Sequence, residues 1–134
     1  MLREIAEALA LLLPDDADLL AGLELGGVPL AVVLSQISGL PALFVRKQAK
    51  QYGTKRLAEG GEVAGRRVVV IEDVVTSGGQ VIESCRALRE HDAVVTDVLC
   101  VIDREAGGRD SLAATGLALQ PLFTMSQLRD AADG

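Results

Sequence analysis

The middle of the chain reads Val68-Val69-Val70-Ile71-Glu72-Asp73-Val74-Val75-Thr76-Ser77-Gly78-Gly79. Its first four residues are aliphatic, which is typical of a central strand buried on both faces. Two acids follow at once, and hydroxyl residues and glycines then lead into residues 80–90, whose apolar side chains recur at helical spacing. The stretch therefore predicts a strand, a polar turn and a helix in direct succession.

The segments on either side repeat this alternation. Patterning predicts further strands at 17–23, 43–45, 93–102 and 117–123, and helices at about 2–13, at about 30–38 and after a cap at Ser126. The order α-β-α-β-loop-β-α-β-(α)-β-α favours right-handed crossovers. We therefore predict an α/β fold in one domain, 1–134, with a mostly parallel twisted sheet of about five strands flanked by helices. Ligands of such sheets bind beyond the carboxyl ends of the strands, where the polar turn falls.

Composition excludes several classes of protein. Aromatic residues make up 2% of the 134 residues, so the core must be aliphatic, and the net charge of −6 argues against general binding to nucleic acid. The apolar runs are far shorter than a membrane span. Cys85 and Cys100 lack metal-ligand spacing, which favours free thiols in a reducing compartment. We expect a cytoplasmic protein with neither membrane nor nucleic acid as a partner.

The polar turn has the chemistry of a phosphate cradle. Thr76 and Ser77 offer hydroxyl donors, the adjacent glycines let backbone N–H groups approach closely, and the following helix presents its positive end. Glu72 and Asp73 do not favour a phosphate directly, so they suit ribose hydroxyls, a cation or a developing positive charge. The alternative is a strand-to-helix turn capped by Thr76 or Ser77.

The whole string resembles the signature of type I phosphoribosyltransferases: four apolar residues, two acids, two apolar residues, then Thr-Ser-Gly. This resemblance implies that Glu72 and Asp73 hold the ribose 2- and 3-hydroxyls and stabilise an oxocarbenium-like transition state. It also implies a group of residues around the 5-phosphate: Val75, Thr76, Ser77, Gly78, Gly79 and Gln80. Gln80 departs from the small hydroxyl residue common at its position, although a backbone amide can serve there.

The segment Glu24-Leu25-Gly26-Gly27-Val28-Pro29-Leu30 lies at a predicted strand–helix junction. Taken alone, it reads as a turn with proline near the start of a helix. Its Gly-Gly-Val-Pro-Leu string resembles the orotate branch of the phosphoribosyltransferases. In that family the turn binds diphosphate through backbone N–H groups, which implies this role for Glu24, Leu25, Gly26 and Gly27.

A basic run, Arg46-Lys47-Gln48-Ala49-Lys50-Gln51-Tyr52, leads into a long polar loop. Such a run is usually a solvated surface. Its Arg-Lys-x-x-Lys spacing also resembles the orotate branch, which implies that Arg46, Lys47 and Lys50 meet the diphosphate, with a catalytic role for Lys50. The same resemblance implies a homodimer in which loop 46–64 reaches the neighbouring site. Tyr52 replaces the family's usual His and can donate a hydrogen bond but carries no positive charge near neutral pH.

Arg104 follows a predicted strand within Asp103-Arg104-Glu105. A surface ion pair is the simplest reading, whereas the orotate enzymes pair the matching arginine with the carboxylate of the base. The resemblance implies transfer of a phosphoribosyl group from 5-phosphoribosyl 1-diphosphate to orotate, in pyrimidine biosynthesis, with Mg²⁺ held by the substrate and no protein ligand set. The family's N-terminal hood is not found in this sequence. Two alternative functions therefore stay open: a regulatory protein that only binds the diphosphate substrate, and a transferase for another base.

Overall fold

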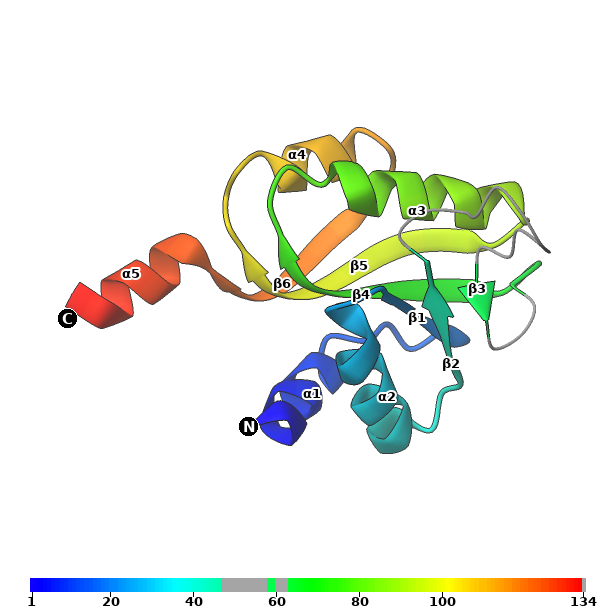
Figure 1. Cartoon of the computed structure of the whole chain (residues 1–134), viewed down its shortest axis with the longest axis horizontal. Coiled ribbons are helices and arrows are strands. Elements are labelled where there is room, and N and C mark those ends of the chain that lie inside the picture. Colours follow the sequence, from blue (N-terminus) through cyan, green and yellow to red (C-terminus); the bar gives the residue numbers. More distant parts are fainter. Residues whose placement is uncertain (47–57, 60–62, 134) are drawn as a thin grey trace.

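The computed structural model describes residues 1–46, 58–59 and 63–133, which form one sheet with helices on both faces (Figure 1). The strands are β1 (Leu19–Leu23), β2 (Ala42–Val45), β3 (Ala58–Glu59), β4 (Arg67–Val75), β5 (Val94–Asp103) and β6 (Ala118–Thr124). The helices are α1 (Leu2–Ala10), α2 (Gly27–Ser38), α3 (Gly79–Glu90), α4 (Gly108–Ala113) and α5 (Met125–Asp133).

The sheet has the strand order β3-β2-β1-β4-β5-β6. All neighbouring strands are parallel except for β2 and the two-residue β3, which pair antiparallel. Helices α1 and α2 cover one face, and α3 and α4 cover the other (Figure 1). The predicted fold class, a mostly parallel sheet of about five strands flanked by helices, is confirmed. In the described part of the chain, no helix has the length and apolar character needed to cross a membrane.

Alternate residues of β4 pack into two separate hydrophobic cores, one on each face of the sheet. Val68 and Val70 pack with α3 and α4, whereas Val69 and Ile71 pack with α1 and α2. All four side chains are at most 2% exposed. This explains the unbroken aliphatic run, because a central parallel strand has no solvent-facing side.

Several boundaries differ from the prediction, and three of these differences bear on the site. Strand β4 continues beyond Ile71 to Val75, because the long neighbouring strand β5 pairs with it as far as Asp103. Helix α2 begins at Gly27 rather than near Leu30, so Pro29 lies in its first turn, where its missing N–H costs little. Ser126 is not the cap of α5 but lies inside its first turn.

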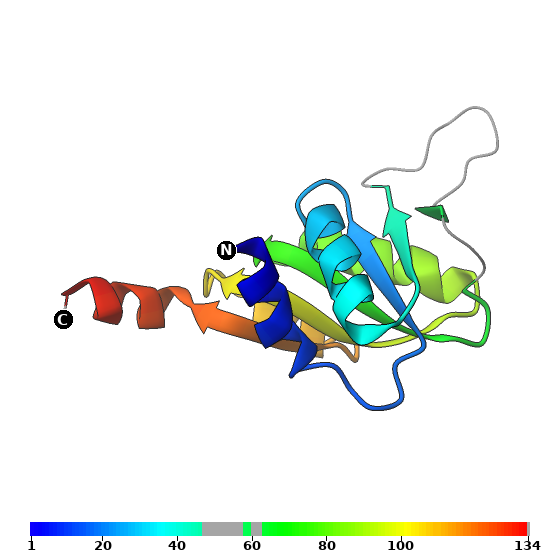
Figure 2. The same ribbon diagram turned by 90° about the horizontal axis from the view of Figure 1, so that it is seen from below.

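The sheet has a switch point between β1 and β4. From β1 the chain passes through α2 to β2 on one side, and β4 then continues on the other side of β1 toward β5 and β6. The turns that follow β1 and β4 therefore open at the same edge of the sheet, which is where ligands of such folds bind. Helix α5 follows the carboxyl end of β6 and projects away from the sheet (Figure 2).

The two cysteine thiols are free and buried. Burial raises the pKa of Cys85 to about 12. Burial also raises the pKa of Cys100 to about 12, and the carboxylates of Asp103 and Glu72 add to this effect. Both pKa values in the folded protein lie above the ordinary thiol value of 9.0, so the thiols favour folding below about pH 9. That contribution is lost as the pH rises toward 12.

We therefore expect iodoacetamide at pH 8 to label the folded protein at least about a hundredfold more slowly than the urea-unfolded protein. Mass spectrometry at timed intervals measures both rates. Equal rates would contradict the burial of the thiols.

Candidate active site

The acid pair lies on the part of β4 that extends past β1. The last paired residues of these two strands are Gly22 and Ile71, whereas β4 stays paired to β5 as far as Val75. Asp73 is exposed and Glu72 is half-buried. The Asp73 N–H donates to Glu72 Oε1 at 3.0 Å, and the Val74 N–H donates to Asp73 Oδ1 at 2.8 Å. The strand thus presents two carboxylates, held by backbone donors, at the carboxyl edge of the sheet.

The turn between β1 and α2 packs so closely against the end of β4 that a Cβ atom on either of its glycines would displace a neighbouring group. A Cβ atom on Gly26 would lie 2.2 Å from Asp73 Oδ2, and one on Gly27 would lie 2.2 Å from the Ile71 carbonyl oxygen. The peptide bond between Glu24 and Leu25 in this turn is cis. The two predicted substrate segments, 24–27 and 72–79, therefore meet in space.

The phosphate-type turn follows β4 directly. Thr76 and Ser77 are exposed, and Gly78 has a φ of 87° at the start of α3, a conformation that favours glycine. The start of α4 supports this turn from behind: a Cβ on Gly108 would lie 2.5 Å from the Thr76 carbonyl oxygen. The turn is thus fixed in shape, with its hydroxyl groups and the N-terminal end of α3 facing solvent.

Three comparisons place this arrangement among known proteins. Residues 1–118 match the family described as Phosphoribosyl transferase domain. An orotate phosphoribosyltransferase from a Nocardioides species is 54% identical over 128 residues, which cover 96% of this chain and 72% of the relative. The chain belongs to the orotate phosphoribosyltransferase family.

Two solved structures have the same fold. A phosphoribosyltransferase from Corynebacterium diphtheriae has a TM-score of 0.84 at 37% identity, covering 94% of this chain and 76% of that one. The orotate phosphoribosyltransferase of Mycobacterium tuberculosis, in complex with 5-phospho-alpha-D-ribosyl 1-diphosphate, has a TM-score of 0.83 at 32% identity. That match covers 95% of this chain and 75% of the other.

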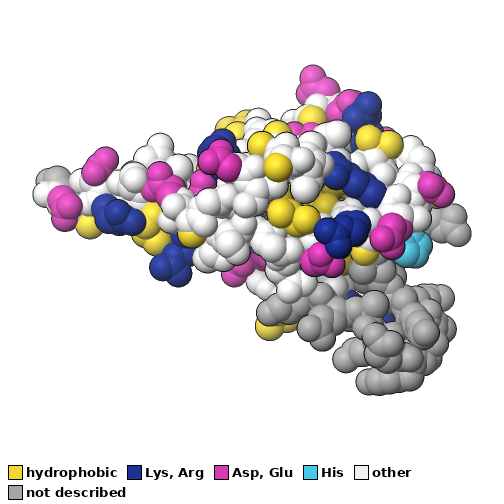
Figure 3. Space-filling view, turned by 90° about the horizontal axis from the view of Figure 1, so that it is seen from above, with side chains coloured by type: hydrophobic (Ala, Val, Ile, Leu, Met, Phe, Trp, Pro, Cys, Tyr) yellow, Lys and Arg dark blue, Asp and Glu magenta, His cyan; other side chains and the backbone are white. Residues whose placement is uncertain are grey.

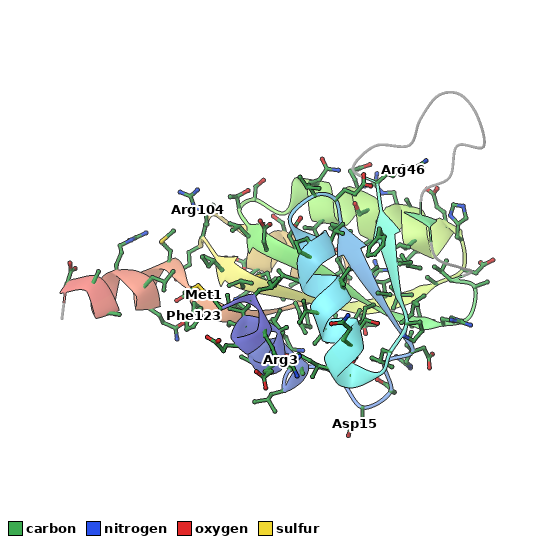
Figure 4. All side chains as sticks on the ribbon, turned by 60° about the horizontal axis from the view of Figure 1, so that its bottom comes forward. Met1, Arg3, Asp15, Arg46, Arg104 and Phe123 are labelled. Atoms are coloured by element: carbon green, nitrogen blue, oxygen red, sulfur yellow. The ribbon has the colours of Figure 1, made fainter. Side chains whose placement is uncertain are left out.

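Of the remaining residues that the family resemblance singles out, two arginines lie in the described part of the chain and three residues lie outside it. Arg46 is half-buried at the end of β2, and Arg104 is exposed at the end of β5. Figure 4 places both arginines on the same side of the ribbon and Asp15 at the opposite side. Lys47, Lys50 and Tyr52 lie outside the described residues. The described part of the candidate site thus contains the acid pair, two glycine turns and two arginines.

Two features of the site were not singled out from the sequence. No role was predicted for Gly108, yet it backs the phosphate-type turn. Glu105 was not assigned a role, yet its carboxylate accepts hydrogen bonds from Ser126, 21 residues away. Only the small size of Gly108 could have indicated the first contact, and no local pattern indicates the second.

A pocket of about 290 Å³ lies at the other edge of the sheet, lined by Ile82, Arg86, Arg89, Glu90 and Thr115. Figure 3, which looks onto the face that carries α3 and α4, shows basic side chains among apolar ones there. The Arg89 guanidinium donates to the carbonyl oxygens of Thr115 and Val95 at 2.7 and 2.6 Å. Arg89 therefore ties α3 to the sheet, and the pocket lies apart from the candidate site.

Proposed function

We propose that this protein transfers the phosphoribosyl group of 5-phosphoribosyl 1-diphosphate to orotate, giving orotidine 5-phosphate and diphosphate in pyrimidine biosynthesis. The observation that carries the proposal is the contact between the Gly26 turn and the Asp73 carboxylate. It joins a diphosphate-type turn to a pair of acids suited to a ribose. The family membership and the M. tuberculosis relative solved with the diphosphate substrate support the same reaction.

Each segment has one task in the reaction. Residues 75–80 hold the 5-phosphate through hydroxyl and backbone N–H groups at the start of α3. Residues 24–27 hold the diphosphate, and Glu72 and Asp73 hold the ribose hydroxyls. The bond between ribose C1 and the diphosphate oxygen breaks with its electron pair on the oxygen. A ring nitrogen of orotate forms the new bond to C1 and releases its proton to water. The two carboxylates stabilise the positive charge that develops on the ribose.

The residues at the site fit Mg²⁺ bound mainly through the substrate. Among the described residues, no group of three or more His, Cys, Asp or Glu side chains could hold a metal ion. Mg²⁺ usually keeps several waters and takes one or two carboxylates together with substrate oxygens, and Glu72 and Asp73 are the carboxylates at this edge. When bound, the ion neutralises charge on the leaving diphosphate.

The basic residues outside the described part complete the proposal. Lys47, Lys50 and Tyr52 belong to loop 46–64, which we expect to reach the site of a second copy in a homodimer, with Lys50 at the leaving diphosphate. Light scattering tests this, and a monomer under assay conditions would contradict it. Two buried free thiols in one domain agree with a cytoplasmic location; cell fractionation checks it.

Orotate consumption tests the reaction directly. The protein is mixed with the diphosphate substrate, Mg²⁺ and orotate, and the loss of orotate absorbance is followed. A panel of other pyrimidines and purines is run in parallel. Turnover confined to orotate supports the proposal. Turnover on another base makes the protein a transferase for that base, and substrate binding without any turnover makes it a regulatory protein.

Arg104 should determine affinity for the carboxylate of the base. Arg104→Ala removes a guanidinium that can bind a carboxylate through two hydrogen bonds, so KM for orotate is expected to rise by roughly ten- to a hundredfold. KM for the diphosphate substrate should change little.

Arg86→Ala is the matched control, because it removes an exposed arginine that pairs with Glu83 at 2.7 Å on α3. Surface pairs of this kind contribute little. An unchanged KM for orotate in Arg104→Ala would exclude Arg104 from the base site.

A further inference from the structure

Several contacts fix the backbone of the turn after β5, which carries Arg104. The Arg104 N–H donates to the Val75 carbonyl oxygen at 3.0 Å. Asp103, only 2% exposed, accepts from the Glu105 N–H at 2.9 Å and lies 3.9 Å from the Arg109 guanidinium. Glu105 has a φ of 60°, which is unfavourable for a residue with a Cβ atom. The turn is thus held in a specific shape while the Arg104 side chain stays exposed.

Glu105 links this turn to α5. Its Oε1 accepts from the Ser126 N–H at 2.6 Å and from the Ser126 hydroxyl at 2.5 Å. These two hydrogen bonds are the main reason that the pKa of Glu105 lies below its ordinary value, so the charged carboxylate is favoured. Ser126 lies in the first turn of α5, where a negative charge complements the free N–H groups and the helix dipole.

The start of α5 is fixed a second time by its own residues. The Thr124 hydroxyl accepts from the Gln127 N–H at 3.2 Å, and Gln127 Oε1 accepts from the Thr124 N–H at 2.8 Å, which together form a capping box. None of the described side chains of α5 is buried. The bond to Glu105 is therefore not needed for the core, and its effect is to fix α5 relative to the Arg104 turn.

We propose that Glu105 is a positioning residue for orotate: by bonding Ser126, it locks the turn that carries Arg104 to the first turn of α5. The backbone that carries the Arg104 guanidinium is then fixed before the base arrives, which reduces the ordering cost of binding. Glu105 itself does not touch the substrate. This inference rests on the proposed function, because it gives Arg104 the carboxylate of the base as its partner.

Three variants separate the charge of Glu105 from its shape. Glu105→Gln keeps the size of the side chain without its charge, Glu105→Ala removes both, and Ser126→Ala removes only the hydroxyl donor. In Glu105→Ala, KM for orotate is expected to rise about five- to tenfold, with kcat and KM for the diphosphate substrate unchanged. Glu105→Gln and Ser126→Ala should give smaller rises. Glu83→Gln, which alters another exposed glutamate paired with an arginine on α3, is the matched control and should match wild type.

A double-mutant cycle isolates the contact itself. If the two side chains act through one bond, Glu105→Ala combined with Ser126→Ala should raise KM for orotate less than the product of the two single effects. Independent effects would show that Glu105 does not act through Ser126 and would overturn the inference.

The remaining outcomes separate this inference from the proposed function. A wild-type protein that binds the diphosphate substrate by calorimetry but never consumes orotate overturns both. Normal wild-type turnover with an unchanged KM for orotate in Glu105→Ala overturns the positioning role alone. A fall in kcat and a rise in both KM values, with a lower unfolding midpoint, would show a merely structural role and also overturn it.

Discussion

Replacing Asp73 by Asn is expected to lower kcat by roughly a hundred- to a thousandfold, the range observed when one preorganised stabilising group is removed from a transition state. Asn keeps the size of the side chain and an oxygen that can accept a hydrogen bond from the Val74 N–H. In the wild-type protein this bond runs to Asp73 Oδ1 at 2.8 Å. It loses the negative charge that opposes the positive charge developing on the ribose. Because Asp73 is exposed, the free energy of unfolding should stay close to that of wild type.

Steady-state kinetics and urea unfolding of the same preparation measure the two effects separately. Asp15→Asn is the matched control, because Asp15 is also exposed and lies on the side of the molecule opposite Arg46 and Arg104 (Figure 4). Its kcat and stability should equal those of wild type. Near-normal turnover in a folded Asp73→Asn protein would remove Asp73 from the chemistry.

The sheet and the position of the site could be predicted because they depend on local patterns. The aliphatic run 68–71 is what a doubly covered central strand requires, and parallel strands bring their carboxyl ends to one edge. Element boundaries were less predictable. The charges of Glu72 and Asp73 suggested an end to β4, yet hydrogen bonding to β5 continues as far as Val75 and Asp103.

The contacts that shape the site depend on the tertiary fold and leave no local signal. Ser126 looked like a helix cap, because Ser at the start of a polar helix commonly is one. In the structure Thr124 fills that position with Gln127, and Ser126 instead donates to Glu105. The sequence indicates that Gly26 and Gly27 form a turn. Only the fold reveals that Gly26 lies against the side chain of Asp73 and Gly27 against the backbone of Ile71.

That difference predicts opposite consequences for two neighbouring substitutions. A Cβ on Gly27 would meet the carbonyl oxygen of Ile71 in the middle of the sheet, which cannot move without disturbing β4. Gly27→Ala is therefore expected to lower the free energy of unfolding by about 3 kcal/mol, the upper part of the usual range for overpacking. This is a large share of the roughly 5–15 kcal/mol that stabilises a typical domain.

The atoms nearest to a Cβ on Gly26 would be those of the Asp73 carboxylate, and this side chain can rotate away. Gly26→Ala should therefore unfold near the wild-type urea concentration but lose turnover, because the acid is displaced from the ribose. Gly79→Ala is the control for stability, since a Cβ there meets nothing within 4 Å and the residue lies in α3. It should be neutral or slightly stabilising. Urea unfolding of the three variants beside wild type decides the matter: if Gly27→Ala is as stable as Gly79→Ala, the turn does not pack on β4 as described.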